Sequence, residues 1–204
     1  MSQGMMNMPK APADITPAKF FTQWLPQQIE PLAGMIGAIA GDVSAAIATR
    51  VIGAGDWTAT LAGGKVKVEP GIKPDSLVTF VLSEKHFIEV VTGQRANLMQ
   101  PPPGAGKASP DQMAAQAKQN LLALKEIHGS IKFVIEDAKA PFEAMVKFAG
   151  PLTEEPSCTL AIGLETIQAI GRGETNPQAA FMAGQIRIEG DMTILMQLMP
   201  LMPT

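Results

Sequence analysis

The chain of 204 residues has few of the reactive groups that enzymes and metalloproteins use. It contains one cysteine, Cys158, so no internal disulfide can form. Its two histidines, His86 and His128, have no metal-ligand spacing to each other or to Cys158. We therefore expect no metal site, and we expect Cys158 to be a buried, inert thiol.

Charge is also scarce. Charged residues make up 17% of the chain, below the usual quarter, whereas apolar residues make up 46%. The net charge is −3 and no run of Lys or Arg occurs, so the features of a nucleic-acid binder and of a polybasic membrane patch are missing. We expect no nucleic-acid partner. The surplus of apolar residues predicts a cavity, an interface or a membrane contact.

The common catalytic motifs are incomplete or missing. The stretch 101–109, "PPPGAGKAS", lacks the first glycine of a phosphate-binding loop and the hydroxyl residue after Lys107. In "GRGETN", Asn176 stands where a dinucleotide fingerprint needs its third glycine. Asp191, which could pair with Glu189, is better explained as a helix N-cap. No nucleophile, base and orienting residue come together, so we expect a non-enzymatic protein without a cofactor.

Two segments in the first third of the chain bear on whether the protein is secreted or spans a membrane. Residues 1–14 have no apolar core of a secretory signal, so we interpret them as a disordered tail and expect a cytoplasmic protein. Residues 32–52 are as long as a membrane span, but Asp42 lies at their centre. An acidic residue at mid-bilayer costs roughly 2.5–3.5 kcal/mol. The prediction for 32–52 is a tightly packed helix of a soluble protein.

Residues 15–95 predict helices followed by strands. Thr16 can cap a first helix that begins at Pro17, with four large apolar side chains on one face. Ser83 can cap a short helix that Gly93 ends. Strand-like runs cover 57–61, 65–69 and 77–82, and the four apolar side chains are Phe20, Phe21, Trp24 and Leu25.

The rest of the chain begins with a loop. Residues 96–110 hold three consecutive prolines, which exclude a helix and a central strand. Residues 111–204 then form the predicted core. Its elements are a helix from Ser109 to Ile127, strands over 130–136, 142–148 and 158–163, a helix ending at Gly173, a helix from Asn176-Pro177, a strand over 185–190, and a last helix capped by Asp191.

A weak repeat occurs at an offset of eighty residues. Each half gives strands, then a short helix, then a glycine, and identity between the halves is low. Either the match is chance, or residues 15–95 are a degenerate first copy that lost its ending. The matching positions are 66–68 with 146–148, Thr79 with Thr159, and Gly93 with Gly173.

The segment 157–202 has little chemistry and many apolar residues. It holds two Arg, three Glu and one Asp, but five Met. Its final helix is apolar nearly all round, which predicts burial on more than one side. An ordinary core helix is one interpretation. Methionine fills irregular gaps, so an adaptable apolar pocket is the other.

An ordered set of residues in this segment is specific. It comprises the Cys158-Thr159 strand, the helix ending at Gly173, Asn176-Pro177-Gln178, Ala180-Phe181, Gly184, Ile186 and Ile188, Gly190, and Met192. Over 157–202 this order resembles the sterol carrier protein 2 family. The strands "GSIKFVIE" and "FEAMVKFAG" are similar to the family's first hairpin.

The resemblance implies an α+β fold in which helices cover one twisted, mainly antiparallel sheet of about five or more strands. Between them it implies an apolar tunnel for fatty acids, acyl-CoA, sterol-like or isoprenoid molecules. The residues implied as lining are Phe181, Met182, Ile186, Ile188, Leu195, Met196 and Met199, with Ile162, Ile167 and Ile170 on the far wall. The usual domain is little more than half as long as this chain, and the acidic charge favours a neutral or single-chain ligand.

Three functions therefore stay open. The first is a non-enzymatic cytosolic lipid carrier, whose partner is a hydrophobic small molecule and which makes transient contact with membranes. The second is a structural or interaction module with a filled core that dimerises or docks a partner. The third is an enzyme acting on lipids, for which no catalytic set is found.

Overall fold

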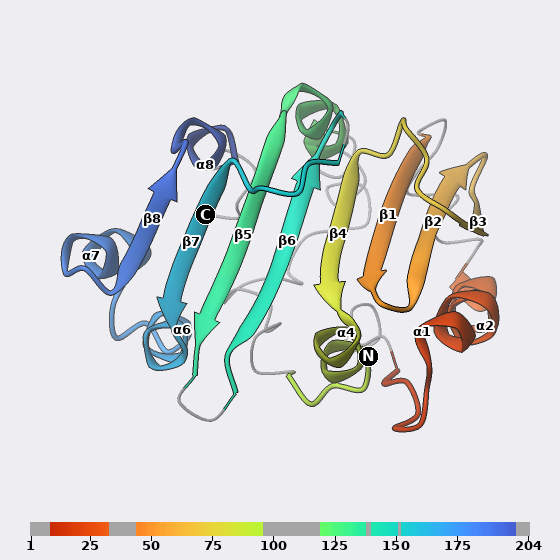
Figure 1. The fold of residues 1–204 in the computed structure, drawn as a ribbon, viewed down its shortest axis with the longest axis horizontal. Coiled ribbons are helices and arrows are strands. Elements are labelled where there is room, and N and C mark those ends of the chain that lie inside the picture. The colour runs from red at the N-terminus through yellow and green to blue at the C-terminus, as the bar shows by residue number, and fades with distance from the viewer. Residues whose placement is uncertain (1–8, 33–43, 96–118, 138–139, 151, 199–204) are drawn as a thin grey trace.

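The computed structural model describes residues 9–32, 44–95, 119–137, 140–150 and 152–198. They form one eight-stranded sheet in the order β3-β2-β1-β4-β6-β5-β7-β8, so β3 and β8 are its edges (Figure 1). The strands are β1 (Ala45–Ile52), β2 (Gly55–Ala62), β3 (Lys65–Pro70), β4 (Val78–Ser83), β5 (Gly129–Glu136), β6 (Phe142–Phe148), β7 (Cys158–Gly163) and β8 (Ile186–Gly190).

The sheet is mixed and mainly antiparallel. Among the described strands, β1 with β4 and β5 with β7 pair in parallel, and the other five neighbouring pairs are antiparallel. The predicted α+β class is therefore confirmed. Antiparallel pairing of β4 with β6 joins the strands before residue 96 to those after 118, so one sheet runs through both parts of the chain.

The helices gather on one face of this sheet, behind it in the view of Figure 1. Residues 119–126 are helical as well. The elements are α1 (Pro17–Lys19), the π-helix η1 (Phe20–Trp24), α2 (Leu25–Ile29), the 3-10 helix η2 (Glu30–Leu32), α4 (Glu84–Val91), α6 (Leu164–Gly171), α7 (Pro177–Met182) and α8 (Thr193–Leu198). None of these helices is long and apolar enough to span a membrane.

Local signals in the sequence explain most of the boundaries. Gly63 and Gly64, with φ of 55° and 72°, make the tight turn between β2 and β3, which needs positive φ at both positions. Ser83 Oγ accepts a hydrogen bond from His86 N at 3.2 Å and so caps α4. Asn176 caps α7 through Ala179 N at 2.8 Å in the same way. The predicted cap of α4 by Ser83 and the predicted start of α7 at Asn176 are confirmed.

The predicted helix over 32–52 is wrong where the structure describes it. Residues 45–52 form β1, a central strand between β2 and β4. Alanine favours a helix in isolation, but here small and β-branched side chains alternate between two sheet faces. Pairing with strands on both sides overrides the intrinsic preference. Residues 33–43, where the rest of that helix was expected, lie outside the described residues, as do residues 96–118.

Part of the N-terminal segment that the sequence predicted to be a disordered tail packs against the rest of the protein. Residues 1–8 lie outside the described residues, but Ala11 is buried and its backbone N donates to Val91 O at 2.9 Å. The segment therefore packs beside α4 before the first helix begins. Thr16 Oγ1 then accepts from Lys19 N at 3.3 Å, which confirms the predicted cap.

Two apolar clusters lie between the sheet and its helices. Around Phe21, aromatic rings stack: its centroid lies 4.7 Å from Trp57 and 5.4 Å from Phe87. The second cluster centres on Ile131, which is fully buried, and includes Ile127 and Ile194. The first cluster packs η1, α2 and α4 on β1 to β4, and the second packs α8 and 119–126 on β5 and β7.

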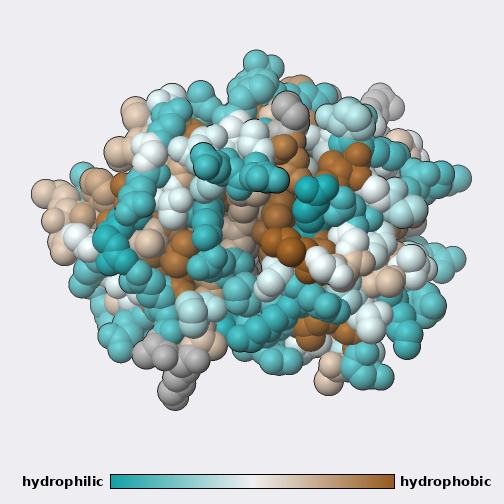
Figure 2. All heavy atoms as spheres, in the orientation of Figure 1, coloured by the Kyte–Doolittle hydropathy of each residue, from teal (hydrophilic) through white to brown (hydrophobic). Residues whose placement is uncertain are grey.

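The opposite face of the sheet is more polar. Figure 2 views the molecule in the orientation of Figure 1 and shows mostly hydrophilic atoms, with a hydrophobic strip near the middle. Lys132 Nζ pairs with Glu143 Oε2 at 2.8 Å, and Arg50 forms a two-pronged pair with Asp56. Apolar residues that alternate along the strands therefore point mainly to the helical side.

Candidate functional site

An apolar cavity of about 570 Å³ lies on the helical side of the sheet. Its floor is built by alternate residues of β1, β4, β6, β5 and β7, and α4 and α6 close one end. The volume falls within the range of about 300–1,000 Å³ that is typical of small-molecule sites. The lining residues are Thr49, Phe80, Leu82, Phe87, Val90, Val91, Phe133, Ile135, Phe142, Ala144, Val146, Ile162 and Ile167.

Strand alternation determines which side chains reach the cavity. In the β4–β6 register Phe80 lies opposite Val146, and Leu82 lies opposite Ala144. Successive residues point to opposite faces, so all four are on the helical side. Phe80 is 41% exposed although it is a large aromatic residue in a central strand. The cavity therefore crosses the line where β4 meets β6.

The lining has almost no capacity for chemistry. Among the described residues that surround the cavity, Thr49 has the one polar side chain, and none has a titratable side chain. An apolar wall with one hydroxyl can solvate a hydrocarbon, and it offers none of the carboxylates, imidazoles or amines that usually transfer protons. The described arrangement suits binding by burial of apolar surface.

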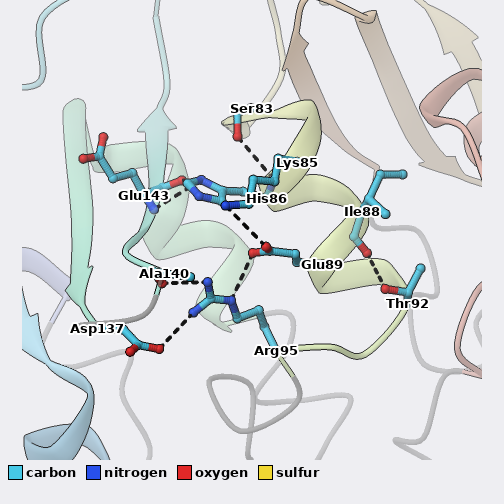
Figure 3. Close-up of polar contacts among 10 residues, drawn as sticks. All are labelled: Ser83, Lys85, His86, Ile88, Glu89, Thr92, Arg95, Asp137, Ala140 and Glu143. Carbon is cyan, nitrogen blue, oxygen red and sulfur yellow. Dashed lines mark hydrogen bonds and ion pairs between the residues drawn. The ribbon is translucent and has the colours of Figure 1, made fainter. Parts of the chain in front are cut away.

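A polar cluster lies beside the cavity at the start of β6 (Figure 3). Arg95 is 8% exposed; its Nε donates to Glu89 Oε2 at 3.0 Å and its Nη2 donates to Ala140 O at 2.7 Å. Its guanidinium lies 5.9 Å from the centroid of Phe142, which lines the cavity. The buried charge is thus paired, and the cluster fixes the position of one wall.

His86 belongs to the same cluster. Its Nδ1 lies 2.9 Å from Glu143 O and 3.3 Å from Glu143 N, and the tautomer decides which hydrogen bond forms. Its ring centroid lies 4.9 Å from that of Phe142. Sequence reasoning gave His86 no part in the site, because its partners are more than fifty residues away in the chain.

The single thiol lies at the other end of the sheet floor. Cys158 is 1% exposed, and burial, with a smaller effect from the Asp191 carboxylate, raises its pKa. A thiol that stays protonated is a poor nucleophile. The interpretation of Cys158 as buried and inert is consistent with this position.

The ten residues implied by the family resemblance are spread over three environments. Ile162 and Ile167 line the cavity. Ile170, Ile186, Ile188 and Leu195 are half-buried, whereas Met199 lies outside the described residues. The remaining three are exposed: Phe181 by 44%, Met182 by 80% and Met196 by 67%.

Sequence reasoning missed the part of the lining that precedes residue 96. A signal for it was present in the offset of eighty residues. That offset carries Ile162, Ile167 and Ile170 onto Leu82, Phe87 and Val90, and all three of these line the cavity. The family's ordered motifs occur in the later segment, so they indicate lining residues there and none before residue 96.

Comparison with known families confirms the resemblance. Residues 111–203 match the SCP-2 sterol transfer family, a longer stretch than the 157–202 on which the resemblance was recognised. No curated protein sequence matches the chain. Residues 15–95 lie outside the family match.

The chain is also similar to solved structures of sterol carrier proteins. Sterol Carrier Protein 2 Like 2 from Aedes aegypti is 17% identical with a TM-score of 0.31, over 43% of this chain and 97% of its own. The sterol carrier protein domain 2 of Helicoverpa armigera is 28% identical with a TM-score of 0.31, over 43% of this chain and 76% of its own. Sterol Carrier Protein 2 from Yarrowia lipolytica is 19% identical with a TM-score of 0.31, over 41% and 79%.

Proposed function

We propose that this chain, whose residues 111–203 match the SCP-2 sterol transfer family, binds a hydrophobic lipid non-covalently and carries it in the cavity across β4 and β6. The observation that supports this most is a 570 Å³ cavity lined almost entirely by apolar side chains. The chemical class is a molecule with a long hydrocarbon part, such as a fatty acid, an acyl-CoA, a sterol-like or an isoprenoid molecule. The protein acts without catalysis.

The energetics favour a ligand with many methylene groups. Each buried methylene contributes about 0.8 kcal/mol, so a long acyl chain gains on the order of 10 kcal/mol before the costs of ordering. Of the lining residues in the described part of the chain, Thr49 is the one whose side chain can offer a hydrogen bond to the ligand. Affinity therefore depends mainly on apolar length and shape, with little contribution from a head group.

Native mass spectrometry of gently purified full-length protein, followed by solvent extraction, tests this function. We expect an excess mass that extracts as a lipid, and uptake of added palmitic acid or cholesterol by stripped protein. Val146→Asp places a charge in the cavity and should weaken uptake about tenfold or more. Met145→Asp, the adjacent residue on the opposite face, is the matched control and should bind normally. A lipid-free protein that also takes up neither probe contradicts the proposal.

A second function, self-association, is favoured by a separate observation. Four large apolar side chains close to the β8 edge are exposed: Phe181, Met182, Met192 and Met196. Exposed apolar patches mark interaction surfaces. Sedimentation at several protein concentrations tests it: a dimer weakened by Met182→Lys supports self-association through this surface, and a monomer at every concentration contradicts it.

A further inference from the structure

We infer that residues 45–93 and residues 129–190 are a first and a second copy of one structural unit, the first copy being truncated at its end, and that the two copies share one binding cavity instead of holding one each. The inference about the shared cavity rests on the proposed function. Four independent observations support it. They are the strand registers, the helix ends, the pairing of β4 with β6, which we call the seam between the copies, and the residues that line the cavity.

The strand registers of the two copies agree position by position. In the first copy Ile47 of β1 lies beside Val78 in parallel and Ala59 in antiparallel pairing. In the second copy Ile131 of β5 lies beside Cys158 in parallel and Val146 in antiparallel pairing. A hairpin followed by a parallel strand on its other side is thus built twice, with β1, β2 and β4 equivalent to β5, β6 and β7.

The helices that follow the parallel strands end in the same way. Thr92 after α4 has φ −84° and ψ −4°, and Arg172 after α6 has φ −85° and ψ −4°. Gly93 and Gly173 follow with φ of 74° and 72°. Both glycine amides donate to the carbonyl three residues earlier, at 3.0 Å. A chance match of a few residues in the sequence does not explain why α4 and α6 have the same length and the same geometry at their ends.

The equivalence also corrects one detail of the sequence repeat. Residues 66–68 lie in β3, whereas 146–148 lie in β6, which is equivalent to β2. That part of the letter match therefore joins non-equivalent strands. Thr79 with Thr159 and Gly93 with Gly173 do fall on equivalent positions.

Each copy supplies a strand that the other lacks. β6 pairs with β4 through Val78 opposite Phe148, in the place where β8 pairs with β7 through Cys158 opposite Gly190. Conversely, β4 lies beside β6 in the place that corresponds to β3 beside β2. The first copy has no equivalent of β8, and the second has none of β3, among the residues that the structure describes. The pairing of β4 with β6 supplies the missing neighbour of both copies at once.

The cavity follows from this join. Six lining residues come from the first copy and seven from the second. Leu82 and Ile162 are equivalent and both line it, as do Phe87 and Ile167. Two equivalent walls that face a common space give one site, which is larger than either copy builds from its own residues.

Polar contacts between the copies support the cavity at the seam (Figure 3). His86 from α4 contacts the backbone of Glu143 in β6, and Arg95 binds Ala140 O and lies 3.7 Å from Asp137 Oδ2. All of these contacts run from α4, or from Arg95 two residues after Gly93, to the hairpin of the second copy. They hold α4 against the wall that Phe142 forms.

The test measures ligand stoichiometry in the full-length chain. Stripped protein is loaded with palmitic acid, and native mass spectrometry counts the bound molecules. The paired variants are Phe80→Asp with control Val81→Asp in the first copy, and Phe133→Asp with control Val134→Asp in the second. Each control places the same charge on the adjacent residue of the opposite face. Circular dichroism verifies that every variant is folded, and Ala144→Phe fills the cavity without adding charge.

We expect one ligand per chain, and about tenfold weaker binding or more in Phe80→Asp, Phe133→Asp and Ala144→Phe alike. Two ligands per chain would overturn the shared cavity while leaving lipid binding intact. Loss of binding in Phe133→Asp but not in Phe80→Asp would do the same, because the first copy would then contribute no wall. Wild-type protein that binds no palmitic acid, cholesterol or extracted lipid would overturn the shared cavity and the proposed function together.

Discussion

Phe80 in β4 lies directly opposite Val146 in β6, and both side chains line the apolar cavity. The two residues are 66 positions apart in the chain and belong to segments that only the sheet brings together. Their contact makes the β4–β6 pair a structural junction and the floor of the site at once. Stability and ligand binding therefore depend on the same strand pair.

The first prediction concerns cooperativity across that junction. Ile131→Ala removes a fully buried side chain from β5 and should lower the free energy of unfolding by about 2–5 kcal/mol. Because one sheet connects all eight strands, hydrogen exchange should accelerate in β1 and β4 as well as in β5. Two separate unfolding transitions, or faster exchange in β5 to β8 alone, would contradict a single cooperative sheet.

The second prediction uses the difference between two equivalent helix caps. Ser83 caps α4 with its side chain, whereas Gly163 occupies that position before α6 without a side-chain bond. Ser83→Ala should lower stability by about 1 kcal/mol, and Gly163→Ser should raise it by a few tenths to 1 kcal/mol. Gly163 has φ −69°, and an added Cβ meets Thr166 Oγ1 at 3.6 Å, so the serine fits. Urea denaturation of both variants measures the pair; a destabilised Gly163→Ser would refute the equivalence of the caps.

A third prediction separates the cavity from the last helix. Met196 is 67% exposed and is not among the residues that line the cavity. Met196→Lys should therefore change the free energy of unfolding by no more than about 0.5 kcal/mol and leave palmitic acid binding unchanged. Isothermal calorimetry and thermal melts give the two values. Weakened binding without unfolding would restore Met196 to the site that the family resemblance implied.

The fourth prediction concerns alkaline pH. Burial lowers the pKa of Lys147, which is 5% exposed and donates from Nζ to Ala149 O at 2.7 Å. Between this lowered pKa and the unfolded value of about 10.4, the unfolded chain binds more protons than the folded one. Stability attributable to Lys147 should therefore rise with pH through that interval and then level off.

Urea denaturation between neutral pH and pH about 10.4 measures that slope. Lys147→Met should remove the rise, and the exposed Lys65→Met should retain it. The same slope in Lys147→Met and in the wild-type protein would show that another group is responsible.

The last prediction tests the aromatic cluster under the N-terminal helices. Phe21 and Trp57 stack with an interplanar angle of 11°. Phe21→Ala should cost about 3–5 kcal/mol, and Phe21→Leu less, because leucine fills more of the space. A double-mutant cycle with Trp57→Leu should give a coupling of about 0.5–1.5 kcal/mol. A coupling near zero would mean that the rings contribute only buried area.

Much of the fold was predictable because its signals are local. Ser83, Asn176 and Asp191 cap helices where their spacing predicted, and Asp191 Oδ1 accepts from Thr193 N at 2.8 Å. Alternation of apolar and polar residues predicted β8, and the family resemblance predicted the β5–β6 hairpin. β1 was mistaken for a helix because its alanines carry a strong local preference, which only the partners on both sides overcome.

The site was less predictable for a different reason. Ile162 and Ile167 were found through the family motif, but Phe80 and Phe87 carry no motif. Their place depends on the pairing of β4 with β6, which nothing in the alternation of either strand specifies. Many strands share that alternation, so a pattern of period two cannot choose the partner.

The two copies are related by a step along the sheet, with equivalent strands pointing the same way. Such a step does not close on itself, so further units could in principle add without end, as in a fibre. The edges oppose this growth: β3 presents Lys65 and Lys67 and ends in Pro70, and β8 has only five residues. Charge, proline and a short strand all discourage edge pairing. The chain thus joins its own two halves strand to strand while resisting the same join with a neighbouring molecule.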